Sequence, residues 1–190
     1  MAGMILYLHG FCSSSQSWKA RALAAALKTR GLQDRLICPD LPWEPAAAIA
    51  LCERRIAQAS VPITLVGSSL GGYYATFLAE RHNLNAVLLN PAVVERIPPE
   101  RWLGTHVRLH CPEETFELTS VHLDQLGALK TPKISPERYL LLVETGDEVL
   151  DYRDAVARYA GCAQVILSGG NHSFSRFQEQ IPKILGFAGL

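Results

Sequence analysis

One serine lies in a sequence context suited to nucleophilic chemistry. Gly67-Ser68-Ser69-Leu70-Gly71 fits the pattern G-x-S-x-G, in which the central serine stands on a sharp turn between a strand and a helix. Glycine is expected at both flanking positions because a side chain there would collide with the turn. A glycine-rich turn of a nucleotide-binding fold is the alternative. The strand-like run Ile63–Val66 before the motif and the helical run Leu70–Arg81 after it favour Ser69 as a nucleophile, whereas Ser68 lacks the glycine spacing.

A histidine in the right place could activate this serine. A serine hydroxyl reacts at neutral pH only with a neighbouring base, and after such a turn the partners follow in the order serine, acid, histidine. Of the six histidines, His172 alone follows both Ser69 and an acid that ends a strand. His172 is therefore the predicted general base, and the alternative is a surface histidine that opens a helix.

The acid that would orient the histidine is expected directly after the strand that precedes it. Asp147 lies in the turn after the run Tyr139–Glu144, where its carboxylate could accept the second imidazole N–H. Two other acids are nearby. Glu148 is expected to be solvated, and Asp151 is better explained as the N-cap of a helix that begins near Tyr152.

The backbone of two loops could stabilise an oxyanion. His9-Gly10-Phe11 directly follows the apolar run Met4–Leu8, which we expect to pair with the strand before the serine. The backbone N–H groups of Phe11 and Leu70 are the predicted oxyanion donors, since acyl transfer needs two donors where negative charge develops. Gly10 would let the loop approach closely, and the His9 side chain is expected to hold the loop rather than act as a base.

Short apolar runs alternate with helical patterns along the chain, which predicts one α/β domain over residues 1–190. Little polar alternation within the runs indicates a mostly parallel sheet of about six strands covered by helices on both faces. The expected strands are Met4–Leu8, Arg35–Cys38, Ile63–Val66, Asn85–Leu89, Tyr139–Glu144 and Gln164–Leu167. The expected helices are about Ser17–Arg30, Pro45–Ala59, Leu70–Arg81, Tyr152–Tyr159 and a C-terminal helix broken near Pro182.

Residues 92–136 interrupt this alternation. The segment is rich in proline and has a clear helical pattern only at about Thr119–Leu129, so we expect an insertion before the fifth strand, or a small cap. Trp102, Phe116 and Leu118 in it could line an acyl pocket or pin the insertion to the core.

Composition argues against several classes of partner and site. Eighteen basic and eighteen acidic residues give a formal net charge of zero at pH 7, so no nucleic-acid or membrane partner is expected. No apolar run approaches the roughly 20 residues of a membrane span, and the start of the chain lacks the basic segment of a signal peptide. The five cysteines form no C-x-x-C motif, which is typical of free thiols in the cytoplasm.

No metal or cofactor is expected either. His106 and His110 stand four residues apart with Cys111 alongside, a spacing that on a helix could suit a metal. The stretch looks like a strand or irregular segment instead, and H-E-x-x-H is absent.

The motifs taken together resemble the α/β-hydrolase superfamily, and more narrowly the small bacterial esterases of the YqiA type. The matching stretches are LYLHGF, GSSLGGYYA, LLNPA, FELT, ERYLLLVETGDEVLDYR and GG-x-HSF. The resemblance implies a minimal α/β-hydrolase fold, without the usual N-terminal antiparallel strands, and a triad of Ser69, Asp147 and His172. It also implies hydrolysis of a small-molecule acyl ester or thioester. The alternatives are a non-catalytic ligand-binding protein of this fold, or an acyltransferase or peptidase with the same triad.

Overall fold

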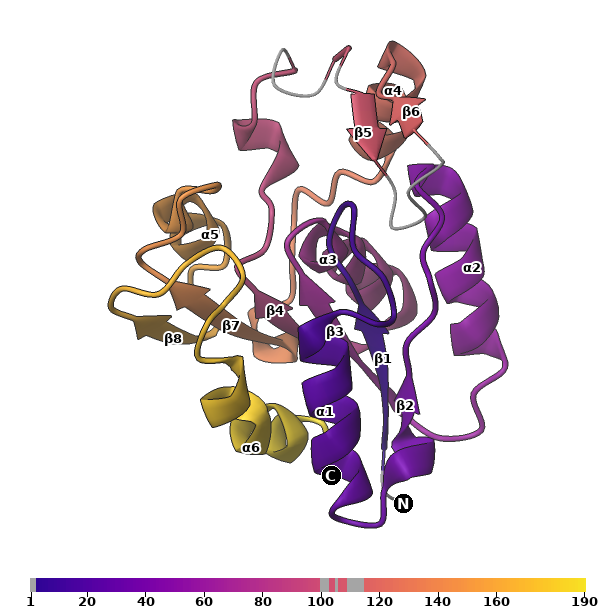
Figure 1. The fold of residues 1–190 in the computed structure, drawn as a ribbon, viewed down its shortest axis with the longest axis vertical. Coiled ribbons are helices and arrows are strands. Elements are labelled where there is room, and N and C mark those ends of the chain that lie inside the picture. Colours follow the sequence, from indigo (N-terminus) through magenta and orange to yellow (C-terminus); the bar gives the residue numbers. More distant parts are fainter. Residues whose placement is uncertain (1–2, 100–102, 105, 109–114) are drawn as a thin grey trace.

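A six-stranded, all-parallel sheet forms the centre of the molecule (Figure 1). The computed structural model describes residues 3–99, 103–104, 106–108 and 115–190. The strand order is β2-β1-β3-β4-β7-β8, so β1 and β3 are neighbours as expected. The strands are β1 (Met4–Leu8), β2 (Leu36–Ile37), β3 (Ile63–Ser68), β4 (Asn85–Leu89), β7 (Tyr139–Glu144) and β8 (Ala163–Leu167). The predicted fold class is confirmed.

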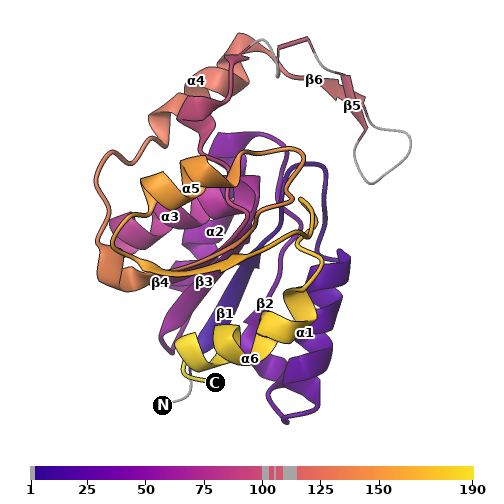
Figure 2. The ribbon, with the colours of Figure 1, turned by 90° about the vertical axis from the view of Figure 1, so that its left-hand side faces the viewer.

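Alternate residues of the central strands supply two separate cores, because successive side chains of a strand point to opposite faces. Leu6 and Leu8 of β1 belong to one core, and Ile5 and Tyr7 belong to the other. The first core packs against α2 (Pro45–Ala57), α3 (Leu70–His82) and α5 (Tyr152–Arg158), and the second against α1 (Trp18–Lys28) and α6 (Phe177–Phe187). Figure 2 shows the two groups of helices on opposite faces of the sheet. Continuous apolar strands were therefore the correct signal of a doubly covered sheet.

The C-terminal helix corrects one expectation, since α6 continues through Pro182 without a break. Proline removes one backbone N–H from the helical hydrogen-bond ladder and crowds the preceding turn. Phe177, Ile181, Ile184 and Leu185 on this helix are all buried in the second core. Burial of each such side chain stabilises by about 1.5–3 kcal/mol, which is enough together to offset the lost hydrogen bond.

The chain between β4 and β7 leaves the sheet and returns to it. The described part contains two short antiparallel strands, β5 (His106–Arg108) and β6 (Thr115–Glu117), and the helix α4 (Ser120–Ala128). Helix α4 is fixed to the domain, since the Tyr73 hydroxyl of α3 donates to the Leu126 carbonyl at 2.9 Å. Leu118 is buried, whereas Trp102, His110, Cys111 and the side chain of Phe116 lie outside the described residues.

Candidate active site

The backbone of Ser69 is held in an unusual conformation at the end of β3. Its φ of 53° and ψ of −120° are rare for a residue other than glycine. The Ser69 N–H donates to Leu89 at 3.0 Å, and its carbonyl accepts from Gly72 at 2.9 Å and Ala92 at 3.0 Å. Such a strained conformation persists only where the surrounding contacts hold it in place. Here hydrogen bonds hold both the N–H and the carbonyl of Ser69.

Glycine is required at both positions that flank Ser69, as the sequence motif predicts. A Cβ atom on Gly67 would run into the backbone of Gly71, and one on Gly71 would run into the Leu8 carbonyl. Because these neighbours are backbone atoms of the sheet and helix, they cannot move aside. The strand, the turn and α3 are therefore packed too closely for any side chain at these positions.

The structure brings Ser69, His172 and Asp147 into one hydrogen-bonded chain. His172 Nε2 lies 3.1 Å from Ser69 Oγ, and His172 Nδ1 lies 2.8 Å from Asp147 Oδ2. The carboxylate can only accept, so Nδ1 carries the proton and Nε2 accepts from the serine hydroxyl. The Asp147 side chain is 2% exposed, and its Oδ1 also accepts from the backbone N–H groups of Val149 and Leu150 at 2.9 Å.

The two neighbouring acids have different roles. Asp151 caps α5 by accepting from the Arg153 N–H at 2.9 Å, as expected. Glu148 is exposed, yet it also accepts from the backbone N–H of His172 at 2.9 Å. Glu148 is therefore more than a solvated side chain, because it helps to hold the histidine loop.

Glu144, the last residue of β7, organises the loop that carries His172, and the sequence analysis missed it. Its carboxylate is fully buried and accepts from the backbone N–H groups of Asn171 at 2.7 Å, Ser175 at 3.0 Å and Arg176 at 2.9 Å. Burial alone would raise the pKa of Glu144, but these backbone hydrogen bonds lower it overall. Gly170 is needed beside it, because a Cβ there would overlap the carboxylate.

Asn90 holds the same loop from the other side and was also missed. Its Nδ2 donates to the carbonyls of Asn171 at 3.0 Å and His172 at 3.3 Å, and its Oδ1 accepts from the Glu144 N–H at 2.9 Å. Asn90 directly follows β4 and has a φ of 40°. The signal in the sequence was a polar residue at the end of a buried strand, directly before Pro91.

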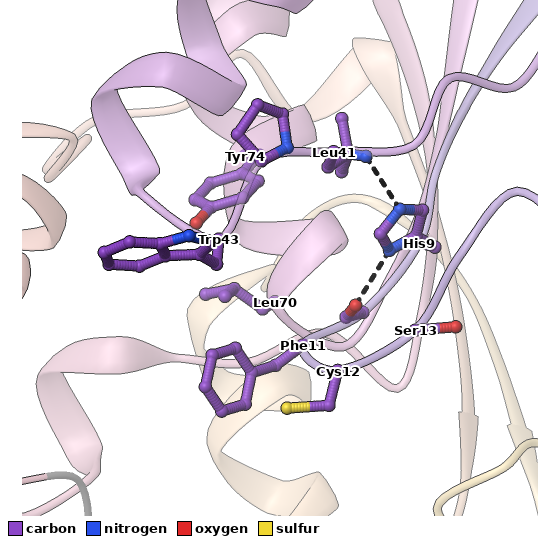
Figure 3. A pocket seen from close by; sticks show the side chains of 10 residues that line it. His9, Phe11, Cys12, Ser13, Leu41, Trp43, Leu70 and Tyr74 are labelled. Atoms are coloured by element: carbon purple, nitrogen blue, oxygen red, sulfur yellow. Dashed lines mark hydrogen bonds between the residues drawn. The ribbon is translucent and has the colours of Figure 1, made fainter. Parts of the chain in front are cut away.

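The loop after β1 lies against Ser69. A Cβ on Gly10 would come within 3.2 Å of Ser69 Cβ, so the loop approaches the serine as closely as the sequence suggests. The His9 imidazole ties this loop down, as expected. It accepts from the Leu41 N–H at 2.9 Å and donates to the Gly10 carbonyl at 2.9 Å (Figure 3). Figure 3 also shows Phe11, Trp43, Leu70 and Tyr74 around a small adjoining cavity of about 30 Å³.

Two larger cavities of contrasting chemistry meet at Ser69 and His172. The apolar cavity, of about 290 Å³, is lined by Phe11 and by the four aliphatic residues Ala92, Ile97, Val149 and Leu150. The polar cavity, of about 190 Å³, is lined by Phe11 and Gly10 and by Tyr7, Ser13, Lys19, Ser68 and Ser173. A substrate bound at the serine therefore has an apolar and a polar space beside its reacting carbon.

Over the part of the chain that the structure describes, no group of three histidine, cysteine or acidic side chains could hold a metal ion. None of the described helices combines the length and apolar character needed to cross a membrane.

Known structures share this fold at low sequence identity. Mouse alpha/beta hydrolase domain-containing protein 10 has a TM-score of 0.73 and 16% identity, with 95% of this chain and 87% of that chain covered. The monoacylglycerol lipase of Paleococcus ferrophilus has a TM-score of 0.71 and 16% identity over 98% and 94% of the chains. A structure described under the metagenome-derived lipolytic enzymes LipS and LipT has a TM-score of 0.71 and 17% identity over 99% and 96%.

A family model also matches nearly the whole sequence. Its match spans residues 4–189, from the first strand through α6, and it therefore includes all the residues that meet at Ser69. The chain belongs to the uncharacterised protein family UPF0227, and its fold is that of the α/β hydrolases.

Proposed function

We propose that the protein is a serine hydrolase that cleaves carboxylic esters or thioesters through an acyl-enzyme on Ser69. The observation that carries this proposal is the hydrogen-bonded chain from Ser69 Oγ to His172 Nε2, and from His172 Nδ1 to Asp147. The esterase and lipase neighbours in the structure comparison support the same reaction class.

The first half of the reaction transfers the acyl group to the enzyme. Ser69 Oγ attacks the carbonyl carbon while His172 Nε2 takes the hydroxyl proton, and Asp147 stabilises the resulting imidazolium. The bond between the carbonyl carbon and the leaving oxygen or sulfur then breaks. His172 returns the proton to that leaving atom, which departs as an alcohol or thiol.

The second half regenerates the enzyme. Water attacks the acyl carbon and gives a proton to His172, the bond to Ser69 Oγ breaks, and the proton returns to that oxygen as the carboxylic acid leaves. The backbone N–H groups of Phe11 and Leu70 are our proposed donors to the oxyanion in both halves. Leu70 opens α3, so its N–H is among those that have no acceptor within the helix, and Gly10 brings the other loop close to Ser69.

The two cavities suggest how an ester would lie. The aliphatic residues of the apolar cavity suit an acyl chain, and its modest volume of about 290 Å³ favours a short or medium one. The polar cavity is then left for the alcohol or thiol part of the substrate.

Replacement of Ser69 by alanine tests this function directly. We expect Ser69→Ala to abolish hydrolysis of 4-nitrophenyl butyrate and covalent labelling by a fluorophosphonate probe, with the thermal unfolding midpoint nearly unchanged. Ser60→Ala is the matched control, since Ser60 is exposed in the loop before β3, at the opposite end of that strand. Equal labelling of the wild type and the Ser69 variant would contradict the proposal and favour a non-catalytic ligand-binding protein.

A further inference from the structure

A buried lysine lines the polar cavity, and nothing in the proposed acyl transfer uses it. Lys19 lies in the first turn of α1 and is only 9% exposed. Lysine is rarely buried to this extent without a partner. Lys19 lines this cavity together with Ser69 and His172, so its charge acts close to where a substrate would be bound.

The ammonium group has donors left over. Lys19 Nζ donates to the Ser173 carbonyl at 2.8 Å and lies 5.4 Å from the centroid of the Trp18 ring. Over the residues that the structure describes, Ser173 supplies its one hydrogen-bond acceptor, whereas an ammonium has three N–H donors. Two donors therefore remain for a group that enters the cavity.

The other groups around the cavity add hydroxyls and little opposing charge. The Tyr7 hydroxyl lies near the side chains of Ser17 and Ser68. Glu144 is the carboxylate whose charge acts on Lys19, but its oxygens are occupied by the histidine loop and by Arg176. The carboxylates of Asp147 and Glu148 are likewise held by His172 and its backbone, and none of these three acids lines the cavity. Lys19 is the one Lys, Arg, Asp or Glu among the lining residues, so the charge inside the cavity favours an anion.

We propose that the polar cavity binds an anionic group on the leaving part of the substrate, with Lys19 as its counter-charge. This inference rests on the proposed function, because it assigns a substrate class to the same serine. The substrate is then an ester or thioester with a neutral acyl chain in the apolar cavity and a carboxylate or phosphate on its alcohol or thiol part. The charge belongs on the leaving part because the other cavity is lined by aliphatic side chains, where an unpaired anion would be strongly disfavoured.

Pairs of substrates that differ only in the charge on the leaving part test this proposal. We would measure kcat/KM for butyryl esters of glycolate, 3-hydroxypropanoate and 4-hydroxybutanoate, each against the ester of the matching hydroxy amide. The amide keeps the size and polarity of the group but not its charge. We expect the wild type to prefer the carboxylate by about tenfold or more at the best chain length, since charged hydrogen bonds are the strong ones. Butyryl esters of singly phosphorylated diols show whether the cavity prefers a phosphate or a carboxylate on the leaving part. The monophenyl ester of succinate carries its carboxylate on the acyl part instead, and serves as the comparison for the position of the charge.

Two variants separate binding from a structural role of the lysine. Lys19→Met and Lys19→Gln should bring the carboxylate-to-amide ratio to about one or below. Glutamine can still donate to Ser173, so it preserves that contact without the charge. Lys28→Met is the matched control on the same helix, since Lys28 is exposed, and it should leave the ratio unchanged. An equal loss for both substrates in Lys19→Gln would show that Lys19 only positions the histidine loop and would overturn the proposal.

The same ratio should depend on pH in one direction. Burial lowers the pKa of Lys19 to about 8, against the opposing effect of Glu144. The ammonium therefore loses its charge as pH rises through about 8, and the preference for the carboxylate should fall with it. Tyr7 and His172 are the other titratable groups that line the cavity, and Glu144 is the acid whose charge acts on Lys19. A change in their charge that alters the reaction step itself affects both esters and cancels in the ratio. A ratio that stays constant from pH 6.5 to 9.5 would contradict the assignment to Lys19.

A binding experiment keeps this inference separate from the proposed function. If Ser69 proves unreactive, titration of 4-hydroxybutanoate against its amide, followed by NMR on wild type and Lys19→Met, still tests the cavity. Stronger binding of the carboxylate that is lost in the variant would support the anion site without hydrolysis. Equal binding of both compounds to both proteins would reject it.

Discussion

In the proposed mechanism, the strained backbone of Ser69 and the orientation of His172 serve the same step. The φ of 53° at Ser69 presents its hydroxyl at the carboxyl end of β3, and Asp147 fixes which nitrogen of the histidine faces it. Neither feature would be needed for packing alone. Asp147 is the more informative of the two for a test, because its side chain can be altered without a change in shape.

Asp147→Asn should preserve the turn and lower turnover. The amide oxygen can still accept from the N–H groups of Val149 and Leu150, but the NH2 group would then face His172 Nδ1. An N–H on the amide opposes an N–H on Nδ1, or else Nδ1 gives up its proton and the histidine takes the wrong tautomer. A change of this kind costs about 10⁴-fold in kcat in a serine–histidine–acid triad. Asp151→Asn is the control, because asparagine caps a helix about as well as aspartate. Steady-state kinetics with 4-nitrophenyl butyrate would give the comparison, and equal kcat for the two variants would disqualify Asp147.

Residues that the sequence could identify differ in one respect from those it could not. Ser69, Asp147 and His172 each lie in the turn or loop that follows a strand, and residue type and order suffice to propose them. Lys19 meets Ser173 across 154 positions, and Asn90 meets Asn171 across 81. No local pattern marks such contacts, because their partners are set by how the sheet orders its strands.

The loop between β8 and α6 has to hold His172 while it remains at the surface. Glu144 accepts its backbone N–H groups and Asn90 donates to its carbonyls. The loop thus has a polar anchor on each side, both located at the ends of buried strands. Rigid strand ends can hold such a loop far better than contacts within the loop itself.

Glu144→Gln should disturb this loop more than its substrate cavities. The NH2 group of the glutamine would face backbone N–H groups of the histidine loop that now donate to the carboxylate. Buried donors would then oppose each other where hydrogen bonds had been. We expect kcat to fall by about tenfold to a hundredfold, since small displacements of catalytic groups are costly. KM for 4-nitrophenyl butyrate should change little, because the aliphatic lining is untouched.

The control for this change is Glu179→Gln on α6, where the side chain is exposed and both constants should match the wild type. A rise in KM with unchanged kcat in Glu144→Gln would show that the carboxylate shapes the binding site instead of the histidine loop. The pH profile of kcat/KM for both variants would reveal any change in the titration of the catalytic groups.

At the level of the elements, the sequence predicted more about the strands than about the helix ends. Each apolar run became a strand of the central sheet. The strands β1, β3, β4 and β7 are almost entirely buried, whereas the edge strands β2 and β8 are only partly buried. Proline is a local signal that packing can override, and α6 runs through Pro182 for that reason. The strands β5 and β6 are only three residues each, too short for alternation to be visible in the sequence.

Across the whole molecule, β7 carries buried or half-buried acid networks at both ends. Glu144 ends the strand beside the site, whereas Glu80 of α3 meets its first residue. Glu80 accepts from the Tyr139 hydroxyl at 2.7 Å and from the Ser135 N–H at 2.8 Å, and it pairs with Arg138 at 3.4 Å. The two networks have the same physical form, yet only one of them touches the loop that carries His172.

Glu80→Gln should therefore destabilise the protein while sparing its activity. Burial would raise the pKa of Glu80, but the hydrogen bonds from Ser135 and Tyr139 and the Arg138 charge lower it overall. A carboxylate with a depressed pKa stabilises the fold at pH values above the ordinary range of about 4.3, and this contribution is lost as the pH falls through that range. Urea unfolding at pH 7 should show a loss of about 1–3 kcal/mol in the variant.

The pH dependence makes this prediction specific. The difference in unfolding free energy between the wild type and Glu80→Gln should shrink as the pH falls below about 4.3. The Glu80 carboxylate of the unfolded chain takes up a proton there, whereas that of the folded protein does so only at lower pH. Glu137→Gln, at an exposed neighbouring position, should follow the wild type at every pH. A constant difference across this range would mean that the carboxylate charge contributes nothing and that only the shape of the side chain matters. Specific activity at pH 7 should equal that of the wild type, in contrast to Glu144→Gln, because Glu80 lies at the opposite end of β7 from Ser69 and His172.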